Sequence, residues 1–181
     1  MHSVSLFYII VTFFVALVPN VWAAPHHAFS DLSIRATDRE IDAYLNTHNV
    51  IRAVHNATSL DWSNSLARRA RFWASLCRLE HSGGVLSSEP YGENIAAASG
   101  DFPIDSAVAT FISDEDQYDP AKPSYLRFTQ VVWKSTTELG CASNQCMGLF
   151  KDQPLTPVTI YVCLYNPPGN VIGKAPENVQ N

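Results

Sequence analysis

The chain has 181 residues, of which 46% are hydrophobic and 16% are charged, and its formal net charge is −5 at pH 7. This length suits one domain with a sizeable core, even after a targeting segment is removed. The mildly acidic balance argues against nucleic acid as a partner and against attachment to anionic membranes by charge alone.

Residues 1–23 are predicted to be a cleaved secretory signal peptide. Residues 4–18 are almost all apolar, but this run is shorter than the roughly 20 residues that a membrane-spanning helix needs. Val21 and Ala23 then supply small residues at the −3 and −1 positions of a cleavage site. A retained membrane anchor is the alternative. We expect a secreted, extracellular protein in which residues 24–36 form a flexible lead-in.

Three helices are expected next along the chain. Thr37 and Glu40 have the spacing of a capping box, and apolar residues at helical spacing follow to about His55. A second helix is predicted over about 63–79, and its arginines are interpreted as a solvated face (Arg68, Arg69 and Arg71). A third segment, 102–117, has a proline suited to a first helical turn and an apolar side.

Strands are predicted in the last third of the chain. Two prolines interrupt residues 118–124, and residues 126–136 are too short for periodicity to distinguish a helix from a strand. Residues 138–150 and 157–167 have the composition of strands, and the second alternates apolar residues with Thr, Tyr and Cys. Helices and strands mixed in one domain of this size indicate layered α+β packing.

Four cysteines form an even set, as expected for disulfides in a secreted chain: Cys77, Cys141, Cys146 and Cys163. Two disulfides can connect them in three ways, and spacing alone does not choose among these. Asn56-Ala57-Thr58 is the one N-glycosylation sequon, so Asn56 is the candidate glycosylation site.

Several segments together resemble the CAP superfamily, which comprises cysteine-rich secretory proteins, antigen five and pathogenesis-related one. They include "LNTHNVIRAVHN", "YGENIA", "FTQVVW" and "YVCLYNPPGN", and they cover most of residues 37–178, the predicted CAP domain. The ending "NVIGKAPENV" most resembles fungal secreted members. The resemblance implies a three-layer α-β-α sandwich, and it implies that Cys77 pairs with Cys146 and Cys141 with Cys163.

Relatives of this type carry a cleft with two histidines and two acids that can hold a divalent cation. By motif, His81 and Glu93 correspond to two of these ligands, and Asp114 stands where a glutamate is expected. Arg127 replaces the second histidine, and a protonated guanidinium has no lone pair for a metal. We therefore expect a degraded site without bound Zn²⁺ or Mg²⁺, in which Arg127 pairs with Glu93 or Asp114. A hydrogen-bonded loop role is the alternative for His81 and for Glu93.

The resemblance also implies binding of sterol or fatty acid. The sterol-binding loop corresponds to "QYDPAKPSYLR" and carries Tyr118, Pro120, Pro123 and Tyr125, but it is shorter than in fungal relatives and stiffened by its prolines. A fatty acid would instead contact the faces of the first and fourth helices, and ordinary core packing is the alternative for these residues. They are Ile41, Tyr44, Leu45 and Val131.

The function expected is therefore extracellular lipid binding by a monomeric, non-enzymatic protein. The alternative is a secreted effector-like protein that has lost sterol binding and acts through a host or cell-surface protein. A hydrolase is not expected, because Arg127 removes the metal route to an activated water and no G-x-S-x-G motif is present.

Overall fold

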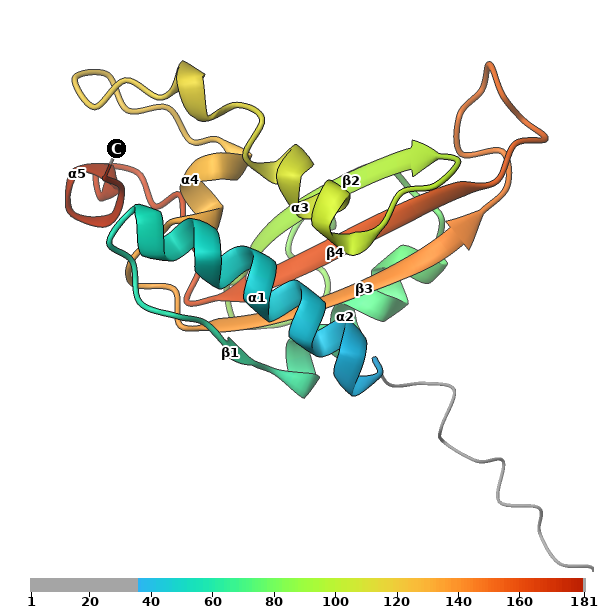
Figure 1. The fold of residues 1–181 in the computed structure, drawn as a ribbon, viewed down its shortest axis with the longest axis horizontal. Coiled ribbons are helices and arrows are strands. Elements are labelled where there is room, and N and C mark those ends of the chain that lie inside the picture. Colours follow the sequence, from blue (N-terminus) through green and yellow to red (C-terminus); the bar gives the residue numbers. More distant parts are fainter. Residues whose placement is uncertain (1–35, 181) are drawn as a thin grey trace, which may run out of the picture. The chain divides into compact units, whose positions relative to one another are not determined.

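A computed structural model describes residues 36–180 of the chain (Figure 1). The predicted signal peptide, 1–23, and the predicted lead-in up to residue 35 lie outside the described residues. Within the described part, no helix combines the length and the apolar character that crossing a membrane requires.

The first helix, α1 (Asp38–Val54), begins with the predicted capping box. Thr37 Oγ1 accepts the backbone N–H of Glu40 at 3.3 Å, and Glu40 Oε2 accepts the backbone N–H of Thr37 at 2.8 Å. The buried face of the helix carries Tyr44, His48 and Arg52, which are spaced four residues apart. The predicted start and approximate end of this helix are confirmed.

The centre of the domain is a four-stranded sheet in the order β1-β3-β4-β2, formed by β1 (Asp61–Trp62), β2 (Gly92–Ser99), β3 (Glu138–Cys146) and β4 (Val158–Asn166). Strand β4 lies between β3 and β2 and is antiparallel to both, whereas β1 is parallel to β3. The two predicted strands correspond to β3 and β4. Strands β1 and β2 were not predicted from the sequence.

Both faces of β4 are buried, so the sheet has helices on each side (Figure 1). Tyr161, Cys163 and Tyr165 pack in one apolar cluster with residues of α1, α3 (Ile104–Phe111) and α4 (Arg127–Val131). Ile160 and Val162 face the opposite cluster with α2 (Asn64–Ser75). Helices, sheet and helix therefore form three layers, which confirms the expected α+β sandwich.

Several helices differ in extent from the sequence-based prediction. Helix α2 ends at Ser75 rather than near Leu79, and the third segment divides into α3 and a short 3₁₀ helix, η2 (Glu115–Gln117). The ambiguous segment 126–136 contains the short helix α4. A terminal helical turn, α5 (Ala175–Asn178), was not predicted.

Two disulfides connect the layers and the strands. Cys77–Cys146 ties the segment after α2 to the end of β3, and Cys141–Cys163 joins directly opposed residues of β3 and β4. These are the pairs that the family resemblance implies. Each closed loop restrains the unfolded chain, which corresponds to roughly 2–4 kcal/mol of stability per disulfide.

Candidate functional site

His81 and Glu93 form a close pair at the start of β2. His81 Nδ1 lies 2.6 Å from Glu93 Oε1, and the Glu93 carboxylate also accepts the backbone N–H of Ser82, at 3.0 Å to Oε1 and 3.3 Å to Oε2. The Glu93 side chain is 7% exposed, whereas that of His81 is 71% exposed. The hydrogen bond to Glu93 raises the pKa of the His81 imidazole. Glu93 therefore fixes the backbone of the His81 loop.

The loop between His81 and β2 is held by a second set of polar contacts. Tyr91 Oη lies 2.7 Å from Ser82 Oγ and accepts the backbone N–H of Leu86 at 3.2 Å. Gly83 and Gly84 adopt φ values of +62° and +85°, which glycine reaches without the steric cost of a Cβ. The loop geometry thus depends on Tyr91 and the two glycines as much as on the acid–imidazole pair.

Asp114 and Arg127 form a second pair, at the amino-terminal end of α4. Arg127 Nε lies 3.2 Å from Asp114 Oδ2, which also accepts the backbone N–H of Arg127 at 3.3 Å. Asp114 Oδ1 accepts the backbone N–H of Phe128 at 3.0 Å. The carboxylate therefore satisfies the first amides of α4 and neutralises the guanidinium. Glu93 and Asp114 were the two partners expected for Arg127, and in the structure Arg127 pairs with Asp114.

The four residues do not fit a divalent cation as they are arranged. No hydrogen bond or ion pair among the described residues joins the His81–Glu93 pair to the Asp114–Arg127 pair. Within residues 36–180, no group of three or more His, Cys, Asp or Glu side chains is close enough to coordinate a metal. Both Asp114 oxygens already accept N–H groups, and Arg127 offers only donors.

Behind Arg127 lies a buried polar network that was not predicted from the sequence. Asn94 Nδ2 donates to the carbonyl oxygen of Arg127 at 3.1 Å and lies 3.4 Å from Tyr165 Oη. His48 Nε2 lies 2.9 Å from the same hydroxyl, and His48 Nδ1 lies 2.8 Å from the carbonyl oxygen of Tyr44. Burial lowers the pKa of His48 to about 4, so the ring is neutral at pH 7. Its Nδ1–H then donates to Tyr44, and Nε2 accepts from Tyr165.

The signal that could have found this network is the asparagine that follows Glu93 in the "YGEN" motif. Successive residues of a strand point to opposite faces, so Asn94 lies on the face of the sheet opposite to Glu93. Only the acid of this motif, Glu93, was predicted to be a site residue. The Asn94 side-chain amide donates to the carbonyl oxygen of Arg127 and thereby helps to fix the backbone there.

The two tyrosines of the predicted lipid-binding loop differ in their exposure to solvent. Tyr118 is 6% exposed, its ring lies 6.2 Å from that of Phe128, and its buried hydroxyl has no hydrogen-bond partner among the described residues. Tyr125 is 38% exposed, and its hydroxyl accepts the backbone N–H of Gly173 at 2.7 Å. Pro120 is exposed and Pro123 is partly buried. The loop therefore presents one ring to solvent and buries the other.

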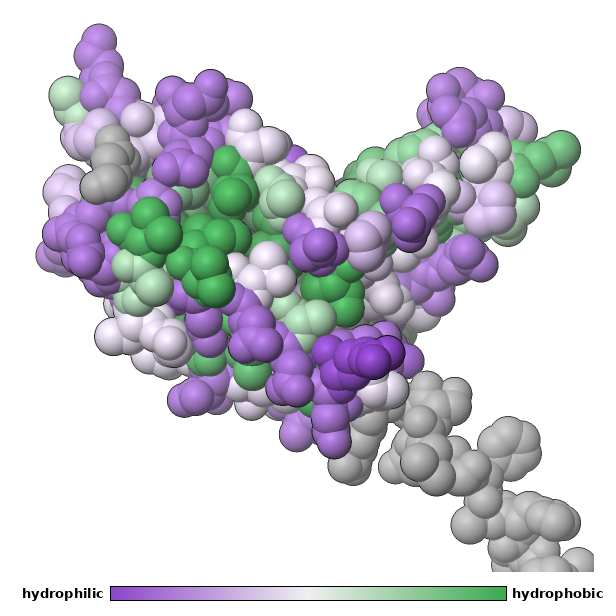
Figure 2. Space-filling model, viewed as in Figure 1, coloured by the Kyte–Doolittle hydropathy of each residue, from purple (hydrophilic) through white to green (hydrophobic). Residues whose placement is uncertain are grey.

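The helix faces proposed for a fatty acid are largely used for packing. Tyr44 and Val131 belong to the buried core, Leu45 packs against it and Ile41 is partly exposed. Tyr44 and Val131 would reach a ligand only if α1 and α4 separated. The outer face of α1 is different: hydrophobic residues gather over its carboxyl-terminal half (Figure 2), where Val50 and Val54 are 68% and 73% exposed.

The candidate glycosylation site is accessible. Asn56 is exposed in the connection between α1 and β1, where its φ is +53°, a left-handed conformation that asparagine tolerates better than most residues. The hydroxyl-bearing residue of the sequon, Thr58, is also exposed.

Comparison with known proteins gives relatives in fungi and plants. Fruiting body protein SC7 of Schizophyllum commune is 38% identical over 142 residues, which cover 73% of this chain and 66% of that protein. Pathogenesis-related protein 1 of Arabidopsis thaliana is 35% identical over 153 residues, which cover 80% of this chain and 86% of that protein. Against three fungal relatives, the chain spans 66%, 52% and 39% of their lengths.

Solved structures share the fold. MpPR-1i superposes with a TM-score of 0.60 at 22% sequence identity, covering 78% of this chain and 96% of that protein. A family model described as CAP, the cysteine-rich secretory protein family, matches residues 45–165. The three-layer fold, the two disulfides and these matches agree, and the chain belongs to the CAP family of cysteine-rich secretory proteins.

Proposed function

We propose that this protein is a secreted lipid-binding protein that recognises a sterol at the 118–126 loop, without a metal ion and without catalysis. The observation that carries the proposal is the Tyr118 hydroxyl, which is buried and has no partner among the described residues. A buried polar group without a partner is costly, and native structures usually satisfy it. A sterol offers one hydroxyl on a flat apolar body, so it can pair with this phenol while its rings contact apolar side chains.

The surroundings of the loop support an apolar ligand. The hydrogen bond from Gly173 to Tyr125 holds the exposed tyrosine ring beside the 171–173 segment, where Val171 and Ile172 are 44% and 85% exposed. These three side chains give an exposed apolar surface next to a loop that carries two prolines. Movement of the loop would open this surface toward Tyr118 and Phe128.

Secretion is part of the proposal. The apolar segment at the start of the chain is predicted to direct export, and family membership supports this. Two disulfides and no free cysteine among the described residues fit an oxidising compartment.

The arrangement at α4 supports the proposed independence from a metal. Arg127 and the N–H groups of α4 occupy the Asp114 carboxylate, and His81 pairs with Glu93 elsewhere. We propose that the Asp114–Arg127 pair replaces a cation as the element that fixes the start of α4. The loop that precedes this helix is then positioned without a metal ion.

The test is a saturation titration of the protein, purified after secretion from a eukaryotic host, with a fluorescent sterol and in parallel with a fluorescent fatty acid. Tyr118→Phe removes only the hydroxyl, so we expect sterol affinity to fall about five- to tenfold, the effect of one hydrogen bond. The same substitution should not lower thermal stability, because the hydroxyl has no partner in the free protein.

Tyr161→Phe is the matched control. Its hydroxyl donates to the carbonyl oxygen of Phe102 at 2.6 Å, so the substitution should lower stability and leave sterol affinity unchanged. Equal sterol affinity of wild type and Tyr118→Phe would reject the phenol as the anchor. Absence of saturable binding of either lipid would reject the lipid function and direct attention to a protein partner.

A further inference from the structure

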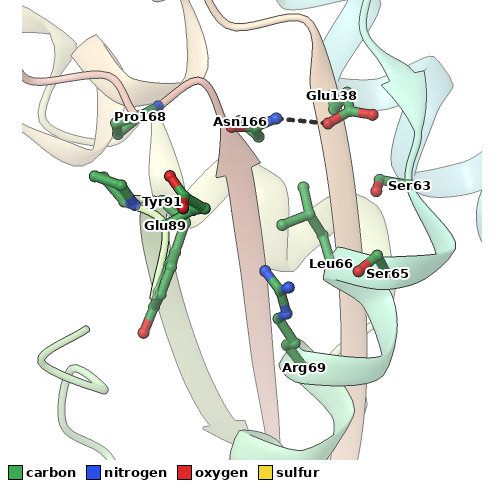
Figure 3. A pocket seen from close by; sticks show the side chains of 10 residues that line it. Ser63, Ser65, Leu66, Arg69, Glu89, Tyr91, Glu138, Asn166 and Pro168 are labelled. Carbon is green, nitrogen blue, oxygen red and sulfur yellow. Dashed lines mark hydrogen bonds between the residues drawn. The ribbon is translucent and has the colours of Figure 1, made fainter. Parts of the chain in front are cut away.

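A cavity of about 450 Å³ lies between α2 and the segment that leads into β2 (Figure 3). Leu66 and Arg69 of α2 line one side, Glu89 and Tyr91 line the other, and Asn166 lies at the end of β4. The volume falls in the lower half of the roughly 300–1,000 Å³ range of small-molecule sites. The cavity is separate from the 118–126 loop, because it shares no lining residue with it.

Two charged groups at this cavity have no protein partner in the described part of the chain, and Glu89, one of them, is exposed to solvent. The Arg69 guanidinium and the Glu89 carboxylate have no hydrogen bond or ion pair to any described residue. Glu138 Oε2 accepts Asn166 Nδ2 at 2.7 Å, which leaves its second carboxylate oxygen without a partner in the described structure. Arg69 was expected to lie on a solvated face of α2. Its side chain is partly exposed and lies across the cavity from Tyr91 (Figure 3).

The balance of charges restricts the class of ligand. Two carboxylates disfavour an anion, one guanidinium disfavours a metal cation, and unpaired charges disfavour a purely apolar molecule. A neutral ligand rich in hydroxyl groups is compatible with all three, because a hydroxyl both donates and accepts. Guanidinium, carboxylate and amide groups are planar and can bind two neighbouring hydroxyls at once.

The aromatic ring adds a second requirement. The Tyr91 hydroxyl is already bound by Ser82 and Leu86, so the residue lines the cavity mainly through its ring. A ring held in this way offers an apolar surface at little entropic cost. On the other side, α2 is fixed closely to the sheet, because a Cβ at Gly140 would collide with the backbone of Ala67. Tyr91 on one wall and the backbone of α2 on the other are thus held in place without a ligand.

We propose that this cavity binds a neutral carbohydrate, namely a short segment of a glycan. The pyranose hydroxyls are bound by Arg69, Glu89 and the free oxygen of Glu138, and an apolar face of the sugar packs on the Tyr91 ring. This site is independent of lipid binding, since the two sites share no residue.

The experiment measures binding of soluble oligomers of glucose, mannose and N-acetylglucosamine to the purified protein by titration calorimetry and by saturation-transfer NMR. We expect saturable binding of one series. Arg69→Met and Glu89→Gln should each weaken it at least about fivefold, which corresponds to the loss of one or more hydrogen bonds. Neither residue has a described partner, so both variants should retain the wild-type melting temperature.

Arg68→Met is the matched control, because Arg68 is exposed on the same helix and does not line the cavity. It should leave carbohydrate binding unchanged. The proposal is overturned if no series binds, or if Arg68→Met and Arg69→Met have equal effects. It is also overturned if only sulfated or otherwise anionic sugars bind, because the cavity would then be an anion site. Sterol binding serves as an independent readout, since it should be the same in all three variants.

Discussion

Arg127 Nε lies 3.2 Å from Asp114 Oδ2, and the same carboxylate accepts the first two backbone N–H groups of α4. The aspartate side chain is 10% exposed and the arginine side chain 40% exposed, so water screens the ion pair from one side only. Asp114 therefore stabilises the amino-terminal end of α4 mainly by accepting its first backbone N–H groups. Its contact with the Arg127 guanidinium serves mainly to compensate the two charges.

Asp114→Asn should lower the free energy of unfolding by about 1–3 kcal/mol, because an amide is a weaker acceptor than a carboxylate and one N–H group loses its partner. Urea unfolding measures the change. Asp116→Asn, at an exposed position of the neighbouring 3₁₀ helix, should change it by less than about 0.5 kcal/mol. Equal effects of the two substitutions would contradict a capping role for Asp114.

Addition of Zn²⁺ or Mg²⁺, or of a chelator, should leave the melting temperature of the wild-type protein unchanged. A ligand that binds only the native state raises this temperature, so its constancy reports that no cation binds at the native His81–Glu93 or Asp114–Arg127 pair. The measurement is differential scanning fluorimetry with and without EDTA. Arg127→His serves as a comparison, because an imidazole can coordinate zinc. Stabilisation of the wild type by zinc would show that Arg127 does not prevent coordination.

The sequence predicted the features that depend on neighbouring residues. The capping box at Thr37 and Glu40 is local, so the sequence alone predicts where α1 begins. Strand β2 was not predicted, because "GENIAAAS" has little β-branched character and forms only by pairing with β4, about 70 residues later. Likewise, no local pattern indicates that Tyr118 turns into the core while Tyr125 remains exposed.

In the candidate site, too, local motifs were predicted from the sequence, whereas contacts between distant residues were not. The family resemblance implied that His81, Glu93, Asp114 and Arg127 form one group, but the structure holds them as two separate pairs. The hydroxyl of Tyr165 joins His48 of α1 to Asn94 of β2, and this arrangement depends on three elements meeting in space. Tertiary packing, which a motif does not encode, decides which polar groups meet.

Acidification should destabilise the protein through His48. Burial lowers the pKa of this residue to about 4, whereas an unfolded histidine has a pKa of about 6.5. Between these values the unfolded chain binds a proton that the native ring does not, so the free energy of unfolding falls as the pH drops. The loss from this residue reaches about 3 kcal/mol at pH 4, at 1.36 kcal/mol per pKa unit.

Urea unfolding between about pH 4 and pH 7.5 measures this dependence, and His48→Gln should flatten it. His81 acts in the opposite sense, because its raised pKa adds stability at low pH that is lost as the pH rises through that pKa. Its side chain is 71% exposed, so solvent screening makes the opposing effect small. An unchanged pH dependence in His48→Gln would contradict the assignment.

Arg52→Lys should be strongly destabilising. The buried guanidinium donates to the carbonyl oxygens of Thr58, Val131, Trp133 and Thr136 at 2.7–2.9 Å. It thereby ties α1 to the α1–β1 connection, to the end of α4 and to the segment that follows α4. A lysine ammonium is a compact charge on a flexible stem and does not reproduce this fork. Unpaired buried carbonyls should cost at least about 2 kcal/mol in urea unfolding. Arg39→Lys, exposed on the same helix, should be nearly neutral, and a similar loss there would contradict the explanation.

Asn56 should carry an N-linked glycan when the protein is secreted from a eukaryotic host. The residue is exposed and lies in a left-handed turn, so a glycan can extend into solvent without displacing the core. Treatment with an N-glycosidase should lower the mass of the wild-type protein measured by mass spectrometry.

Thr58→Ala removes the sequon while Asn56 and its backbone conformation remain, and Thr58→Ser keeps the sequon. We therefore expect the mass shift to disappear in the first variant and to persist in the second. A shift that persisted in Thr58→Ala would place the glycan elsewhere, and no shift in the wild type would argue against modification at this turn.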